Sequence, residues 1–197
     1  MGSRSASSGT FRDDVFTRRA IRNAEDKIRN KDVEHIAVVG KDGKVIYEGK
    51  GTDSTHVQIP KEYRSQLRGT DVTHNHPSGN TFSAEDLKQF GKYELNSLRA
   101  AGPNGTYVIA QAKTLGQKMF QSNMKLYNDY KAYSTNLKAE LHAELQGYAK
   151  DVKMGRMTKA EYDDAKAYLA QCWDKERHQW LKSNQSKYGY TYKKERA

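Results

Sequence analysis

The sequence lacks the features that stabilise exported proteins or hold proteins in a membrane. Cys172 is the only cysteine in 197 residues, so no disulfide can form within the chain. It lies in a helical pattern, and we interpret it as a small core residue rather than a nucleophile. No apolar run reaches the roughly 18 residues that a membrane-spanning helix requires. These absences predict no membrane partner and favour folding in a reducing cytoplasm.

Apolar and acidic residues are also in short supply. Apolar residues make up 36% of the chain, which predicts a modest core to which the 13 tyrosines contribute. The 34 lysines and arginines exceed the 24 acids, giving a formal net charge of +10. Such an excess favours a nucleic acid or an acidic protein as partner. Because the lysines are spread along the chain, the charge could equally serve solubility alone, and both interpretations stay open.

The hydrophobic periodicity divides the chain into three parts. Residues 1–9 are predicted to be a disordered leader, and residues 10–118 to form a domain of mixed helices and strands. Residues 119–197 are predicted to form a helical extension, a hairpin of amphipathic helices ending in a basic-aromatic tail. We expect this tail to be a solvated, partly frayed end, although its alternation could also add a short strand. The fold class is therefore α/β with a C-terminal helical hairpin. Within 10–118, we expect helices over 11–28, 61–67 and 83–102, and strands over 35–40, 45–49, 55–60, 70–73 and 106–111.

The segment DVTHNHPSGNTFSAED, residues 71–86, holds the residues best suited to chemistry. On an extended segment His74 and His76 point to the same side, because side chains alternate along a strand. Gly79 lets the chain turn back sharply, so that Asp86 in the first turn of the next helix reaches the same point. Two imidazoles and one carboxylate leave a fourth zinc position open, as catalytic zinc sites do.

A general base for this site has to come from elsewhere in the chain. Glu34 is the best candidate, because it precedes the first buried strand, and a neighbouring strand would bring it beside a metal-bound water. A structural interpretation competes with this one. Two histidines at this spacing can arise by chance, and Ser83 and Asp86 are fully explained as the N-cap residues of a helix.

The stretch from Val33 to Leu87 resembles the JAMM/MPN+ metalloprotease family, most closely its bacterial RadC-like branch. The resemblance lies in Glu34-His35 before IAVV, in HNHPSG from residue 74 to 79, and in the SAED segment, residues 83–86. Six residues separate the second histidine of this motif from the serine, one fewer than in the family pattern. The family fold is a three-layer mixed sheet with flanking helices, which we therefore expect for residues 10–118.

The same resemblance implies a role for each residue of the motif. It implies that His74, His76 and Asp86 bind Zn²⁺. Glu34 would hold the catalytic water and move its proton to the leaving amine, and the hydroxyl of Ser83 would stabilise the oxyanion. The implied activity is hydrolysis of a peptide or isopeptide bond in a protein or peptide substrate.

The motif and the YGYTY tail are also similar to domains at the C-termini of phage head-morphogenesis proteins and polymorphic toxins. This implies a toxin or processing domain, delivered into a target cell as part of a larger secreted or phage protein. An inhibitor or immunity protein would then be a further partner. Two other functions stay open: a metal-dependent nuclease that uses the same site, and a basic nucleic-acid-binding or assembly module whose site is vestigial.

Overall fold

The computed structural model describes residues 9–112 and 119–196, with side chains described for 15–112 and 124–196. The predicted leader lies outside the described residues except for Gly9, where the first helix begins. The elements along the chain are α1 (Gly9–Ile28), β1 (His35–Val39), β2 (Val45–Lys50), η1 (Lys61–Gln66), β3 (Asp71–Asn75), α2 (Ala84–Lys92), β4 (Ser97–Gly102), β5 (Gly105–Gln111), α3 (Met119–Lys153), α4 (Lys159–Ser183), α5 (Gln185–Tyr188) and β6 (Tyr190–Glu195).

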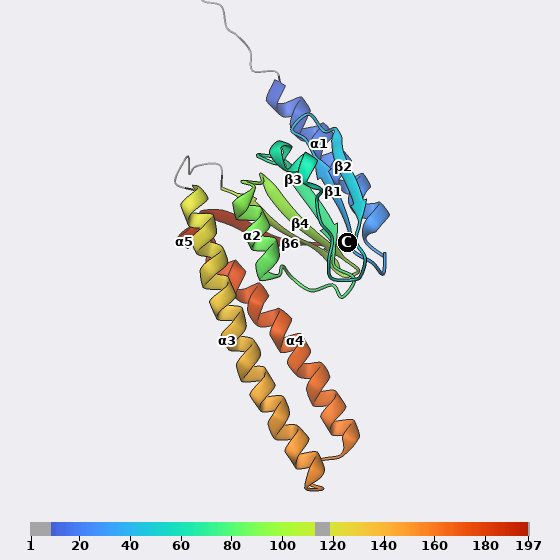
Figure 1. Ribbon diagram of the computed structural model, residues 1–197, viewed down its shortest axis with the longest axis vertical. Coiled ribbons are helices and arrows are strands. Elements are labelled where there is room, and N and C mark those ends of the chain that lie inside the picture. The colour runs from blue at the N-terminus through green and yellow to red at the C-terminus, as the bar shows by residue number, and fades with distance from the viewer. Residues whose placement is uncertain (1–8, 113–118, 197) are drawn as a thin grey trace, which may run out of the picture.

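Six strands of the described residues form one mixed sheet in the order β2-β1-β3-β4-β5-β6. β3 and β4 run parallel, and each other neighbouring pair is antiparallel. α1 covers one face, where its Glu25 accepts hydrogen bonds from Thr73 of β3 and Arg99 of β4. α2 and the base of α3 cover the other face (Figure 1). A mixed sheet flanked by helices confirms the predicted α/β fold class.

The main core lies between the sheet and α2. Val38, Val72 and Leu98 point to this face from three neighbouring strands, and each is at most 3% exposed. Leu87 and Phe90, three residues apart on α2, are fully buried against them. Burying an apolar side chain of this size stabilises the fold by roughly 1.5–3 kcal/mol. These contacts fix the start of α2 relative to β3.

The helix predicted over residues 83–102 is wrong in its second half. α2 ends at Lys92, and Ser97–Gly102 form strand β4. Between them Glu94 has φ 48, a left-handed conformation that ends a helix. The β4 sequence, SLRAAG, favours a helix by propensity. Pairing with β3 on one side and β5 on the other supplies its backbone hydrogen bonds instead, and this tertiary context outweighs propensity.

The strand predicted over residues 55–60 is also wrong, because this stretch is an irregular loop. Asp53 accepts hydrogen bonds from the backbone N–H and the hydroxyl of Thr55, both at 2.8 Å, which folds the chain into a turn. Val57 and Ile59, the apolar residues behind the strand prediction, still pack against the core from this loop.

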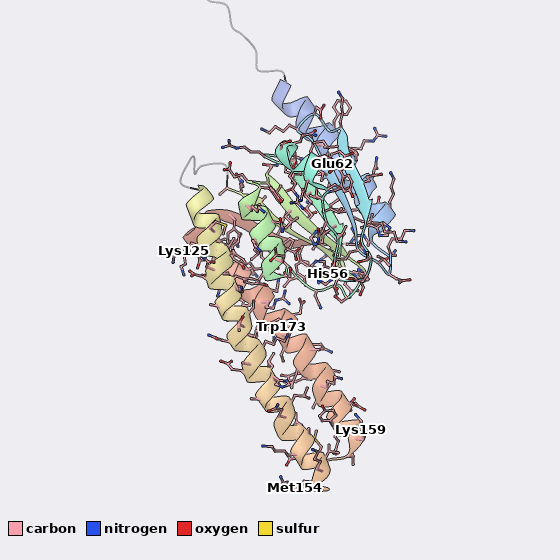
Figure 2. All side chains as sticks on the ribbon, in the orientation of Figure 1. His56, Glu62, Lys125, Met154, Lys159 and Trp173 are labelled. Carbon is pink, nitrogen blue, oxygen red and sulfur yellow. The ribbon has the colours of Figure 1, made fainter. Side chains whose placement is uncertain are left out.

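α3 and α4 form the predicted helical hairpin, which projects away from the sheet (Figure 1). Figure 2 shows Met154 and Lys159 at its far tip and Trp173 nearer the sheet. Tyr130, at the base of α3, is fully buried, whereas the apolar residues nearer the tip are mostly half-buried. Cys172 on α4 is also half-buried, so its predicted core position is wrong.

The basic-aromatic tail forms a short strand, so the expectation of a frayed, solvated end is wrong. β6 pairs antiparallel with β5, placing Tyr192 opposite Ile109. Tyr190 and Tyr192 are buried, whereas Thr191 between them and Lys193 and Lys194 after them are exposed. The C-terminal extension therefore returns to the sheet and completes it. Among the described residues, no helix combines the length and apolar character needed to cross a membrane.

Candidate metal centre

The His-Asn-His segment begins on β3, in the middle of the sheet, and ends one residue beyond that strand. His74 pairs with Ile36 of β1 and points towards α2, and His76 follows on the same side just beyond the strand. Asn75 points to the opposite face. There its side-chain oxygen accepts from the N–H of His35 at 2.6 Å, and its amide donates to the carbonyl of Val33 at 3.2 Å. The middle residue of the motif thus fixes the backbone on both sides of Glu34.

A tight turn follows His76. The N–H of Gly79 donates to the carbonyl of His76 at 2.8 Å, and Gly79 has φ 70, which only glycine adopts without strain. Gly102, at the end of β4, packs so closely that a Cβ there would lie 2.8 Å from the Cα of Gly79. The six-residue connection from His76 to Ser83 therefore bends back at the end of β3, so that α2 begins beside the histidines.

Asp86 is held in the first turn of α2 by a capping box. Its carboxylate accepts from the N–H and from the hydroxyl of Ser83, both at 2.7 Å, and its own N–H donates back to the Ser83 oxygen at 3.1 Å. This confirms the helix-cap interpretation of Ser83 and Asp86. It also leaves the second carboxylate oxygen of Asp86, Oδ1, free to face the histidines.

The three predicted ligands converge on one point. The Nε2 atoms of His74 and His76 are 2.8 Å apart, and they lie 3.3 and 3.5 Å from the Asp86 carboxylate oxygens. Ligand atoms of all three lie within 4.8 Å of one another. Donors around a tetrahedral zinc are separated by about 3.3 Å, so sub-ångström shifts would accommodate the ion.

The orientation of His76 also fits a metal. Its Nδ1 is 2.8 Å from the carbonyl of Asn80, so Nδ1 donates to that carbonyl and Nε2 is the ring nitrogen that faces the cluster. Metal-binding histidines are commonly oriented by such a bond from the other ring nitrogen. His74 is buried, and the three side chains offer two imidazole nitrogens and one carboxylate oxygen as ligands. These ligands fit a zinc ion.

The charges in the cluster support one another. Burial alone would raise the pKa of the Asp86 carboxyl, but the charge and hydrogen bonds of His74 and His76 outweigh it and hold the pKa well below its ordinary value. Burial lowers the pKa of His76, and the hydrogen bond and charge of Asp86 overcome this and raise it. Asp86 is therefore an anion that attracts positive charge at this point, from protonated imidazoles or from a cation.

Glu34 lies beside the cluster, as predicted. It is 8% exposed, and its position one residue before β1 places it on the same face as Ile36 and His74. Its backbone is fixed by a bond from the N–H of Gly51 to its carbonyl at 2.7 Å. Burial raises the pKa of its carboxyl, partly offset by the nearby histidines. A carboxylate with a raised pKa is a better proton acceptor, which suits a general base.

A cavity of about 610 Å³ opens onto these residues. Ile36, Val72 and Leu98 form an apolar floor, the loop from Ser54 to Ile59 forms one wall, and α2 forms another. Its volume falls in the range of cavities that accept a ligand or a short stretch of polymer. The cavity gives a substrate access to Glu34 and to the three candidate ligands.

The structure thus brings together Glu34, His74, His76, Ser83 and Asp86. One feature differs from the expected arrangement: the hydroxyl proton of Ser83 is directed to Asp86, so it has to rotate to reach a substrate oxygen. Sequence reasoning missed Asn80, whose carbonyl orients a ligand, because a backbone atom leaves no residue-type signal. His56 also lines the cavity, from the loop that had been predicted as a strand.

Comparison of the chain with protein-family models, with curated proteins and with solved structures finds no match. The function of the site is therefore inferred from its own geometry and from the motif that builds it.

Proposed function

We propose that the protein is a zinc-dependent hydrolase that cleaves a peptide or isopeptide bond. The observation that carries this proposal is the convergence of His74, His76 and Asp86 beside the buried carboxyl of Glu34, at the wall of an open cavity. A structural metal site would be closed by a fourth protein ligand. Among the described residues, the cluster contains three metal-binding side chains, which leaves room for water or substrate.

Each residue of the site has a task in this reaction. The two histidines and Asp86 would hold the ion, which when bound lowers the pKa of a water molecule and polarises the substrate carbonyl. Glu34 accepts a proton from the attacking water on its carboxylate and delivers it to the departing amine. Burial raises the pKa of the Glu34 carboxyl, which makes its carboxylate a better proton acceptor for this step.

Ser83 contributes in two ways. Its hydroxyl now orients the Asp86 carboxylate at 2.7 Å. By rotating towards the cavity, which Ser83 also lines, the same hydroxyl donates to the negative charge that develops on the substrate oxygen. The motif's resemblance to the JAMM/MPN+ family supports this assignment, and its resemblance to phage and toxin domains supports a protein substrate in a processing or toxin role.

The test begins with zinc content. We expect about one zinc per chain in the wild type and in Glu34→Gln, and none in His74→Ala/His76→Ala, measured by mass spectrometry after purification without added metal. The three proteins are then incubated with an unfolded protein and with isopeptide-linked peptides. Cleavage by the wild type alone supports the proposal. Wild-type protein that does not take up zinc, even when zinc is supplied, contradicts it.

The net charge of +10 supports a second candidate, a metal-dependent nuclease at the same site. The same three proteins are incubated with plasmid DNA and with RNA. Degradation by the zinc-loaded wild type, abolished in Glu34→Gln and by a chelator, with no peptide cleavage, would favour the nuclease. Salt-dependent DNA binding that is indifferent to chelator would favour a binding module.

A further inference from the structure

We infer that α4 of the C-terminal hairpin positions the metal centre, with Asp174 orienting His76 through the peptide unit between Asn80 and Thr81. The inference rests on the metal site proposed above and adds Asp174 and Arg177 to it as positioning residues. Both lie about ninety positions further along the chain than the ligands, outside the motif, and nothing in their sequence context marks them.

The peptide unit between Asn80 and Thr81 is hydrogen-bonded at both its carbonyl and its N–H. Its carbonyl, on Asn80, is 2.8 Å from Nδ1 of His76. Its N–H, on Thr81, donates to Oδ1 of Asp174 at 2.6 Å. A carboxylate bound to the N–H of a peptide polarises that peptide and strengthens its carbonyl as an acceptor. Asp174 therefore strengthens the bond that fixes the His76 ring and keeps the proton on Nδ1.

The next two carbonyls along the same connection are also held from α4. The guanidinium of Arg177 donates to the carbonyl of Thr81 at 3.3 Å and, over a short distance, to the carbonyl of Phe82. Arg177 is 6% exposed, and its Nε donates to the hydroxyl of Tyr130 at 3.0 Å. That hydroxyl donates in turn to the Phe82 carbonyl at 2.7 Å.

The C-terminal strand β6 also forms a hydrogen bond with the connection between His76 and Ser83. The hydroxyl of Tyr192 on β6 is 2.7 Å from that of Thr81 and 2.8 Å from Nδ1 of His178 on α4. Thr81 thus contacts the extension through its N–H, its carbonyl and its side chain. These contacts explain how a connection of only six residues keeps His76 and Asp86 in place relative to each other. Hydrogen bonds from the hairpin and the tail fix the path of this connection.

Metal affinity is the direct measure of such positioning. Removing a residue that orients a ligand typically weakens metal binding 10–100-fold, and Asp174 acts one peptide unit further away. We expect Asp174→Ala to weaken zinc binding about tenfold, measured by competition with a chromogenic chelator on metal-stripped protein. Asp174→Asn keeps an oxygen acceptor for Thr81 and should recover most of that affinity.

Tyr107→Phe is the matched control. The Tyr107 hydroxyl lies 3.3 Å from the other oxygen of Asp174, so this variant removes a contact of Asp174 without touching Thr81. Its zinc affinity should equal that of the wild type. Asp174→Leu, of similar shape but with no acceptor, serves if Asp174→Ala does not fold. Cobalt-loaded proteins add a spectroscopic readout: the visible absorption of Asp174→Ala should shift, because the ring of His76 is less well held.

The outcomes separate the two proposals. If the wild type binds zinc and Asp174→Ala and Asp174→Leu bind it equally well with an unchanged cobalt spectrum, the positioning role is overturned and the metal site stands. An equal loss of affinity in Asp174→Ala, Asp174→Asn and Tyr107→Phe would reveal a general packing effect and overturn it too. If the wild type binds neither metal, the hydrolase proposal itself fails.

Discussion

Tyr130 and Tyr133 lie one turn apart on α3 but have different surroundings. The Tyr130 hydroxyl is buried between Arg177 and the Phe82 carbonyl, whereas that of Tyr133 lies 3.4 Å from a backbone carbonyl near the surface. Removing the Tyr130 hydroxyl leaves a buried guanidinium N–H without its acceptor. We expect Tyr130→Phe to lower the free energy of unfolding by about 1–2 kcal/mol in urea titrations.

Tyr133→Phe is the control for this prediction. Its hydroxyl bond is long and near water, so we expect a change below about 0.5 kcal/mol. Equal effects of the two substitutions would mean that the Arg177 contacts add nothing specific to stability.

His178 is expected to make stability depend on pH. Burial lowers its pKa, Asp174 opposes this, and nearby lysines add to it. The unfolded chain therefore binds the proton more readily than the fold does. The contribution of neutral His178 is complete above the ordinary histidine pKa of about 6.5 and is lost as the pH falls from there through the lower pKa of His178 in the fold.

Urea titrations of metal-stripped protein at about pH 7.5 and about pH 5.5 test this expectation. The free energy of unfolding should fall less with acidification in His178→Gln than in the wild type. His142→Gln, at an exposed position on α3, should follow the wild type. A His178→Gln curve parallel to that of the wild type would show that His178 is not the group responsible.

At the scale of elements, α2 and α4 both begin with a capping box, but the two capping boxes have different roles. Ser83 with Asp86 caps α2, and Thr158 with Glu161 caps α4 at the tip of the hairpin. Both capping boxes satisfy backbone N–H groups that a helix leaves unpaired at its start. Only the first also holds a candidate metal ligand.

Alanine at each cap separates the two roles. Thr158→Ala should speed hydrogen exchange in the first turn of α4, by the equivalent of about 1 kcal/mol, and leave zinc affinity unchanged. Ser83→Ala should destabilise α2 by a similar amount and also weaken zinc binding, because Asp86 loses the hydroxyl that orients it. Zinc affinity that is unchanged in Ser83→Ala would limit Ser83 to capping.

At the scale of the whole molecule, the C-terminal extension has two parts, and they differ in how much the fold depends on them. The distal hairpin projects away from the sheet and ends at Met154, which is 63% exposed (Figure 2). The tail, by contrast, buries Tyr190 and Tyr192 and pairs with β5 along its length. The fold should therefore tolerate loss of the tip and fail without the tail.

Replacing residues 138–172 with a short Gly-Ser linker tests the first half of this statement. We expect the melting temperature to change by no more than about 4 °C and zinc affinity to stay the same, because Tyr130, Asp174 and Arg177 are retained.

Truncation after Gly189 tests whether the fold fails without the tail. Losing two buried tyrosines removes about 3–5 kcal/mol each, comparable to the whole stability of a domain, so circular dichroism should show no cooperative unfolding. A cooperative transition in the truncated chain would contradict this view.

The sequence by itself determined the local features of this protein. Alternation along HIAVV and DVTHN, the turn at Gly79 and the Ser83-Asp86 cap are set by neighbours in the chain, so the strand-turn-helix that brings His74, His76 and Asp86 together was predictable. Glu34 was predictable because an apolar strand follows it directly.

Tertiary structure decided what local preference could not. Residues 97–102 have helical propensity yet form β4, because two neighbouring strands supply their hydrogen bonds. The loop over 55–60 is a cavity wall because Asp53 turns the chain by binding Thr55, and no strand of the described residues pairs with it. Asp174 and Arg177 reach the metal centre only through the return of α4 to the sheet. Contacts across ninety residues leave no periodic pattern in a single sequence, and only the folded chain shows them.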